Sequence, residues 1–327
     1  MAGTSISIVD AIVLGLVEGI TEYLPVSSTG HLILASSLLG LNTPERESAV
    51  NAFTIVVQGG AILAVLGLYW DNVWKMAKGA IGRDNSGFRL LVNLVVAFIP
   101  AAVLGKLLDD HIERVLFHPV PVLLALGVGG VFMIVLHLRL AGRWGPPVPS
   151  LARKELADLT LTEALIIGLL QCVAMWPGTS RSMMTISGGL LVGLKPKAAA
   201  EFSFLLGLPT LTAATLYVLG KDLYTANSTG APSMFDTLGW LPIAVGIGVA
   251  TVSAALAVRW LVGFLARRGL AAFGWYRLAL CAVLAGLWAA GIVTIGAHGR
   301  EVNETQREVP PIEWSPASGT PAGSPRP

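Results

Sequence analysis

The sequence has little charge. Only 13% of its 327 residues are Asp, Glu, Lys or Arg, whereas 54% are hydrophobic, and the mean hydropathy is +0.70. A water-soluble core of this size has no need for long, uncharged segments such as 91–104, 120–138 and 279–297. The composition therefore excludes an ordinary soluble domain and indicates an all-α polytopic membrane protein.

Cysteine and net charge are scarce as well. The two cysteines, Cys172 and Cys281, lie in apolar segments without metal-binding or redox spacing, so we interpret them as packing residues. The net charge of +2, without a cluster of basic and aromatic residues, gives no reason to expect a nucleic-acid partner. The polar segment 299–327 is rich in Pro, Gly and Ser and is predicted to be a disordered tail.

Six segments are apolar and long enough to cross a bilayer as helices, which takes roughly 20 residues. Two further apolar regions, 8–41 and 160–194, are interrupted in the middle by polar residues. Only eleven residues (31–41) follow the first interruption, too few to span, so both regions are predicted to be re-entrant helical hairpins. The six expected spans are 50–70, 89–108, 120–138, 198–220, 239–258 and 273–296.

The distribution of basic residues predicts an orientation. The loops 71–89, 139–158, 195–197 and 259–277 hold 14 of the 22 lysines and arginines, so the positive-inside rule places them in the cytoplasm. Both termini then lie outside, and each half consists of one hairpin and three spans. An odd number of spans inverts the second half.

The sequence therefore predicts an inverted-topology repeat. The first repeat would cover 1–150 and the second 151–298. "PVSS" (25–28) and "PGTS" (177–180) interrupt the two hairpins at similar places. In membrane proteins with inverted repeats and broken helices, the binding site lies where the breaks meet, so we expect the site at these two sequences.

The first hairpin, around "VEGITEYLPVSSTGH", carries two carboxylates in an apolar setting. Glu18 and Glu22 are four residues apart and share one face of a helix. A carboxylate at the bilayer centre is unfavourable by about 2.5–3.5 kcal/mol. The pair therefore needs a cation, a basic partner or water. The competing interpretation is a purely structural pair.

Three hydroxyls and a histidine follow the carboxylates: Ser27, Ser28, Thr29 and His31. They lie where one helix stops and another begins, and the free amides of a helix N-terminus form an anion site. His31 beside two carboxylates and three hydroxyls indicates proton transfer or nucleophilic chemistry.

The second hairpin, "PGTSRSMMTISGG" (177–189), adds a cation. Arg181 is the only basic residue between Lys154 and Lys195. Its planar fork suits bidentate binding of a phosphate. An internal salt bridge from Arg181 to Glu18 or Glu22 is the competing interpretation.

Together the two breaks favour phosphoryl chemistry on a lipid. Arginine, amides and a metal ion offset the charge of a phosphoryl group. Two carboxylates suit a hard divalent cation, Mg²⁺ or Ca²⁺, and a serine or the histidine is available to attack phosphorus. A site at this depth, reached through apolar walls, implies a substrate with a lipid tail and an anionic head.

Both signature stretches resemble those of the undecaprenyl-pyrophosphate phosphatase family, which is associated with bacitracin resistance. The resemblance rests on "EGITEYLPVSSTGH" (18–31) and "PGTSRSMMTISGG" (177–189) and extends over about 8–296, including "FTIVVQGGAILAVL" and "EFSFLLGLP". Met183 and Met184 depart from the small residues usual after "SRS". This departure leaves open how closely the second hairpin packs on the first.

The resemblance implies hydrolysis of undecaprenyl pyrophosphate to undecaprenyl phosphate and inorganic phosphate, which recycles the lipid carrier of peptidoglycan synthesis. It also implies a divalent cation and a site open to the outer face of the cytoplasmic membrane. Carried over by motif, Glu18 and Glu22 are the acidic pair and candidate metal ligands. The hydroxyl–histidine group is Ser27, Ser28, Thr29 and His31, Arg181 is the phosphate anchor, and Ser180 and Thr185 lie beside it.

Several alternatives stay open. Either Ser28 or His31 is the attacking group, with Ser28 preferred and Glu22 or His31 managing the proton. A transporter or flippase of a polyprenyl phosphate or another anion would use the same architecture. Acid-phosphatase-like lipid phosphatases show Ser-Arg-x5-His-x3-Asp, but here Ser187 and Leu191 occupy the His and Asp positions. The sequence also leaves open a homodimer.

Overall fold

The protein is helical throughout the part that the computed structural model describes, namely residues 6–41, 43–145, 154–230, 233–293 and 295. The predicted tail 299–327 and the predicted repeat boundary at 150 lie outside the described residues. Twelve α-helices and one short 3₁₀ turn, but no strand, occur within the described ranges.

The six predicted spans are confirmed as long apolar helices. Three of them, α5, α9 and α11, extend well beyond the expected C-terminal ends, whereas α3 and α12 end earlier than expected. α5 and α9 continue through internal prolines, Pro100 and Pro209. The six helices are α3 (Pro44–Leu68), α5 (Asn85–Leu116), α6 (Pro119–Leu140), α9 (Pro196–Thr229), α11 (Trp240–Arg268) and α12 (Ala271–Ala289).

Two short helices lie in segments that we expected to be loops. α4 (Trp70–Ala80) occupies much of the expected loop 71–89, and α10 (Met234–Leu238) precedes α11. In α4 the polar residues are interleaved with Trp70 and Trp74, whose exposed rings stack 6.4 Å apart. Such a sequence is too polar to span but forms an amphipathic helix.

The two interrupted regions each fold as a pair of short helices, α1 (Ile8–Thr21) with α2 (Ser28–Leu38) and α7 (Leu161–Val173) with α8 (Arg181–Leu191). The helices stop at the polar sequences, as expected. Their re-entry into a bilayer stays a prediction.

Corresponding features recur 153 residues apart in the two halves. Ser27 and Ser180 are the N-caps of α2 and α8, with φ of 74° and 77°. α1 packs closely on α11 of the other half, and α7 packs on α5. Glycines permit both contacts, because a Cβ at Gly15 would lie 2.8 Å from the Gly246 oxygen and one at Gly168 would lie 2.4 Å from the Ala97 oxygen. The inversion of the two halves relative to a membrane stays a prediction.

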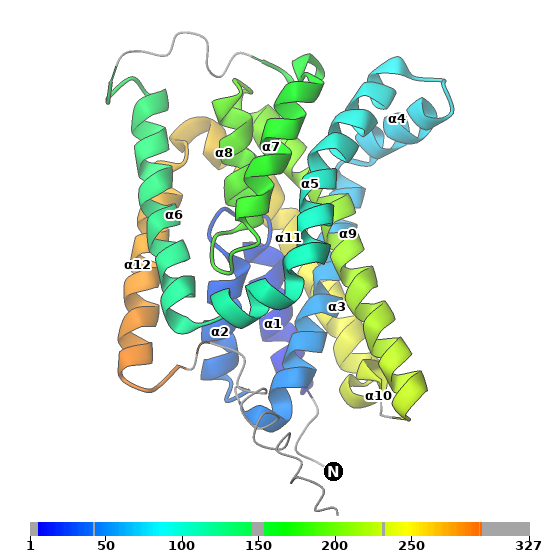
Figure 1. The fold of residues 1–327 in the computed structure, drawn as a ribbon, viewed down its shortest axis with the longest axis vertical. Coiled ribbons are helices and arrows are strands. Elements are labelled where there is room, and N and C mark those ends of the chain that lie inside the picture. Colours follow the sequence, from blue (N-terminus) through cyan, green and yellow to red (C-terminus); the bar gives the residue numbers. More distant parts are fainter. Residues whose placement is uncertain (1–5, 42, 146–153, 231–232, 294, 296–327) are drawn as a thin grey trace, which may run out of the picture. The chain divides into compact units, whose positions relative to one another are not determined.

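The loops of the two helix pairs meet near the middle of the helical unit. In Figure 1, α1 and α2 approach from below and α7 and α8 from above. The loops touch, because the Ser182 hydroxyl donates to the Leu24 carbonyl at 2.8 Å and Arg181 donates to Glu22. The expected meeting of the two breaks is thus confirmed, and Met183 and Met184 are buried without separating the hairpins.

One basic residue that we assigned to a loop lies elsewhere. Arg277 is inside α12 and fully buried, so it is not a loop charge. The orientation inferred from the basic loops therefore rests on the remaining residues and stays a prediction.

Replacing Gly168 tests the close packing of α7 on α5. Gly168→Ala should lower the free energy of unfolding by about 1–3 kcal/mol, because the added methyl overlaps the Ala97 backbone. Gly248→Ala is the matched control, since a Cβ there meets nothing within 4 Å. Thermal unfolding in detergent measures both, and equal melting temperatures for the two variants would contradict the packing.

Candidate active site

A cavity of about 550 Å³ opens where the two hairpin loops meet. Its polar lining from the loops consists of residues that the sequence singled out: Glu22, Ser27, Ser28, Thr29, Ser180 and Arg181. Apolar residues of α5 and α9, including Phe98, Ala101 and Leu211, form much of the remaining wall. A polar floor beneath apolar walls suits a molecule with an anionic head and an apolar tail.

Hydrogen bonds connect three of these residues, Ser28, Glu22 and Arg181, in a chain. The Ser28 hydroxyl donates to Glu22 Oε2 at 2.9 Å, and Arg181 Nη2 donates to Glu22 Oε1 at 3.0 Å. Glu22 is therefore held between a hydroxyl of its own hairpin and a guanidinium of the other. A hydroxyl bonded to a base that a third group orients is the geometry of an activated nucleophile.

Arg181 is fixed by further contacts but keeps a free donor. Its Nη1 donates to the Ser203 carbonyl at 3.0 Å, and its guanidinium carbon lies 5.2 Å from the centre of the Tyr23 ring. Its Nε has no hydrogen-bond partner among the described residues. The salt bridge to Glu22 that we considered as a competing interpretation is present, and Arg181 lines the cavity beside Glu22.

The N-cap serines turn the start of each inner helix toward the cavity. Ser27 Oγ accepts from the Gly30 amide at 3.4 Å, and Ser180 Oγ accepts from the Met183 amide at 3.3 Å. Both serines have positive φ, a conformation that is unfavourable by on the order of 1–3 kcal/mol and concentrates at functional sites.

Thr185 does not line the cavity. It is fully buried, and its hydroxyl donates to the Arg181 carbonyl at 2.9 Å and lies 2.6 Å from Ser203 Oγ. Thr185 therefore supports the backbone of Arg181 and is not itself exposed to the cavity.

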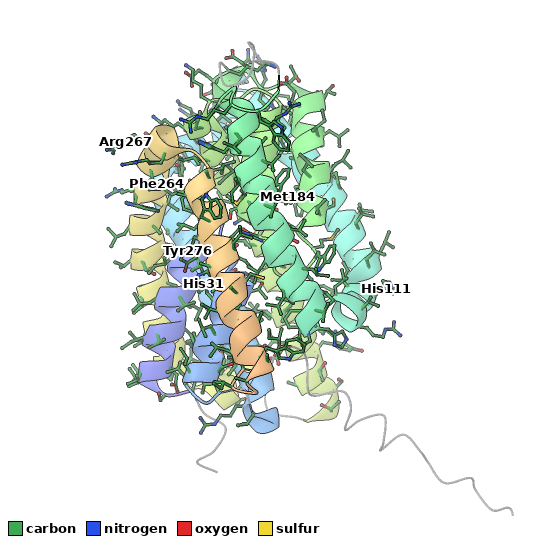
Figure 2. The ribbon with its side chains drawn as sticks, turned by 90° about the vertical axis from the view of Figure 1, so that its left-hand side faces the viewer. His31, His111, Met184, Phe264, Arg267 and Tyr276 are labelled. Carbon is green, nitrogen blue, oxygen red and sulfur yellow. The ribbon has the colours of Figure 1, made fainter. Side chains whose placement is uncertain are left out.

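His31 also lies outside the cavity lining. Its Nδ1 lies 2.7 Å from the Ser27 carbonyl and its Nε2 lies 2.7 Å from the Tyr276 hydroxyl, whose ring it stacks on. Figure 2 shows the two side chains together against α12. A carbonyl only accepts, so Nδ1 carries the proton, and Nε2 of a neutral ring accepts from Tyr276. His31 thereby holds the strained Ser27 backbone.

Glu18 is buried and does not line the cavity. It is 1% exposed, and its Oε1 has no hydrogen-bond partner among the described residues. Its carboxyl group interacts with Glu22, Gln58 and Arg181. No cluster of three or more His, Cys, Asp or Glu side chains that could hold a metal occurs within the described ranges. Any metal here would rest on two carboxylates and on ligand oxygens.

Sequence reasoning missed three polar residues of the cavity. Lys106, Gln171 and Thr210 line it, and they come from α5, α7 and α9. Gln171 is a single polar residue in an apolar segment, and that isolation is its only sequence signal. Lys106 lies at the edge of an apolar run, shortly before Asp109 and Asp110, and Thr210 is one of several threonines in α9, so neither stands out in the sequence.

Arg277 was missed as well. It donates to four backbone carbonyls: those of Gly178 at 2.8 Å, Thr179 at 3.0 Å, Ala125 at 3.0 Å and Leu126 at 3.3 Å. It thus fastens the loop before Ser180 to α6.

The chain is similar to proteins of one family. A family model described as Bacitracin resistance protein BacA matches residues 11–283. Undecaprenyl-diphosphatase 1 of Chromobacterium violaceum is 43% identical over 88% of this chain and 98% of its own length. Undecaprenyl-diphosphatases of Sorangium cellulosum and Clostridium tetani are 43% and 37% identical over 85% and 88% of this chain, and over 85% and 99% of their own lengths. The matched segment includes both loops at the cavity.

Replacing Arg277 by lysine, which removes hydrogen-bond donors, tests its role in holding the second loop. Arg277→Lys should lower the free energy of unfolding by about 2 kcal/mol or more, because one ammonium cannot serve four buried carbonyls. The exposed Arg259→Lys is the control and should stay within about 0.5 kcal/mol of wild type. Thermal unfolding in detergent gives both values, and similar stability of the two variants would refute the role.

Proposed function

The chain belongs to the bacitracin resistance protein BacA family, and on this premise we propose that it is an integral membrane undecaprenyl-diphosphatase. It hydrolyses undecaprenyl pyrophosphate to undecaprenyl phosphate and inorganic phosphate. The reaction recycles the lipid carrier of cell-wall synthesis and thereby confers resistance to bacitracin.

The observation that carries this function is the hydrogen bond from Ser28 to Glu22. At 2.9 Å it is within the range in which a carboxylate takes a proton from a hydroxyl. Arg181 orients the same carboxylate from the opposite hairpin. The cavity thus holds a hydroxyl, a base and a cation beside apolar walls.

Ser28 attacks the terminal phosphorus. Its Oγ forms the new bond to phosphorus while the bond to the bridging oxygen breaks, and the hydroxyl proton passes to Glu22. Glu22 passes this proton to the bridging oxygen, with which undecaprenyl phosphate leaves. Water then attacks the phosphoserine and gives a proton to Glu22, which returns it to the Ser28 oxygen as the bond from that oxygen to phosphorus breaks, so Ser28 is regenerated and inorganic phosphate is released.

Arg181 stabilises the charge of the phosphoryl group during both steps. Its Nε has no hydrogen-bond partner in the described part of the chain, and its Nη2 donates to Glu22. Ser27, Thr29 and Ser180 line the same cavity and bring hydroxyls toward the phosphate oxygens, beside the N-termini of α2 and α8.

Glu18 and Glu22 would hold a divalent cation. The unpartnered Oε1 of Glu18 fits such an ion, and Mg²⁺ in proteins is usually held by one or two carboxylates together with phosphate oxygens. When bound, the ion would neutralise charge on the pyrophosphate.

The geometry favours Ser28 over His31 as the nucleophile. His31 does not line the cavity, and both of its ring nitrogens have partners. Its contact to the Ser27 carbonyl supports the backbone next to Ser28. His31 is therefore a positioning residue, which supports the backbone beside the nucleophile and does not itself react.

We further propose that the protein lies in the cytoplasmic membrane with the cavity open to the outer face. The basic loops would then face the cytoplasm. The alternative function, transport of a polyprenyl phosphate or another anion, has no observation in its favour.

Ser28→Ala should abolish phosphate release. We expect kcat/KM for a polyprenyl pyrophosphate in detergent micelles to fall by about a thousand-fold or more, because the attacking oxygen is lost. Ser37→Ala, whose hydroxyl bonds back to the Ile33 carbonyl of the same helix, is the control and should retain activity. Micelles remove transport but permit hydrolysis.

Two results of this assay would contradict the proposal. Near-normal turnover by Ser28→Ala together with an inactive His31→Ala would make His31 the nucleophile. No phosphate release by folded wild-type protein supplied with divalent metal would favour a transporter.

Glu18→Gln tests the site of the divalent cation. We expect EDTA to stop phosphate release and Mg²⁺ to restore it. The variant should need at least about ten-fold more Mg²⁺ for half-maximal activity, since one of two carboxylate ligands is lost. Asp10→Asn, on the same helix at its exposed N-terminal turn, should respond to Mg²⁺ like wild type. An unchanged Mg²⁺ requirement in Glu18→Gln would remove Glu18 from the metal site.

A further inference from the structure

Gln171 is a polar group of the cavity that the proposed mechanism does not use. It lies near the end of α7 and lines the cavity although it is only 2% exposed. Its amide Nε2 has no hydrogen-bond partner among the described residues. Because a buried donor without a partner is unfavourable, this amide indicates a ligand in the cavity.

The contact to Thr210 determines which end of the amide is free. The Thr210 hydroxyl shares its single proton between the Leu206 carbonyl at 2.8 Å and Gln171 Oε1 at 3.3 Å, and both oxygens accept. The oxygen of the amide is thereby held against α9. The NH₂ end of this amide, whose residue lines the cavity, is thereby left as the donor without a partner among the described residues.

The position of Gln171 corresponds to that of Glu18. The two residues are 153 positions apart, the same interval that separates Ser27 from Ser180. Each is buried and has one polar atom without a hydrogen-bond partner among the residues that the structure describes. The first half thus presents a carboxylate, which suits a cation. The second half presents an amide donor, which suits an anion.

The charges of the cavity also favour an anion. Arg181 and Lys106 are the basic residues among its lining and Glu22 is the acidic one. Lys106 is exposed and extends from α5. A phosphoryl group beside Gln171 would therefore meet a cavity with an excess of positive charge.

We infer that Gln171, held by Thr210, forms a second phosphoryl-binding subsite that takes the phosphate esterified to the lipid. This inference rests on the proposed function. Ser28, Glu22 and Arg181 engage the phosphoryl group that is attacked, and a pyrophosphate has only one other. The Gln171 amide donates to that second group, both in the substrate and in the lipid monophosphate product.

Direct binding of two ligands tests the subsite. Radiolabelled farnesyl monophosphate and radiolabelled inorganic phosphate are bound to purified protein in detergent, without added substrate. Gln171→Leu should raise the Kd of farnesyl monophosphate about ten-fold, as expected for a lost hydrogen bond to a charged group. It should leave the Kd of inorganic phosphate within about two-fold, because that ion binds at Arg181.

Two further variants sharpen the comparison. Gln171→Glu keeps the size of the side chain and its contact to Thr210 but places a carboxylate against the phosphate, so it should weaken farnesyl monophosphate more than Gln171→Leu does. It also serves if Gln171→Leu fails to fold. Ser187→Ala is the matched control, since Ser187 Oγ is buried and has no hydrogen-bond partner within the described ranges but does not line the cavity. This variant should bind both ligands like wild type.

Three results would overturn the subsite. These are wild-type affinity of Gln171→Leu for farnesyl monophosphate, wild-type affinity of Gln171→Glu, or an equal loss of affinity for inorganic phosphate. Binding requires no turnover. A wild-type protein that binds the lipid monophosphate through Gln171 but hydrolyses nothing would therefore count against the proposed phosphatase activity and not against the subsite.

Discussion

The site depends on one buried carboxylate that joins the two halves of the chain. Glu22 accepts from Ser28 of its own hairpin and from Arg181 of the other. An unpaired charge at this depth would be strongly unfavourable, so either partner alone would leave the other charge uncompensated. The same pairing that makes the interface stable also orients the base toward the hydroxyl.

The surrounding helices serve this contact. Close approach of α1 to α11 and of α7 to α5, through Gly15 and Gly168, ties each hairpin to a long helix of the opposite half. Arg277 fastens the second loop, and His31 with Tyr276 fastens the first. Two strained serines then hold the N-termini of α2 and α8 at the cavity. Rigid supports of this kind are what keeps a reactive group in position.

Much of this was predictable because charge is rare in the chain. Apolar runs gave the spans, and the isolated Arg181 and Glu22 had to find partners. The bond from Ser28 to Glu22 was not predictable in detail, because it requires a positive φ at Ser27. Arg277 was misassigned to a loop because it follows Arg267 and Arg268 closely, and Gln171 carries no charge to mark it. His31 was expected in the cavity, but its contact to Tyr276 of α12 is tertiary and could not be read from the sequence.

A double-mutant cycle between Glu22 and Arg181 tests the central claim most directly. The kcat/KM for a polyprenyl pyrophosphate is measured for Glu22→Gln, Arg181→Gln and the variant with both changes. If the two residues act as one unit across the halves, the double variant is about as active as the weaker single variant, which corresponds to a coupling of more than about 1 kcal/mol. If the two losses multiply, the residues act independently, and the proposed connection between the hairpins is wrong.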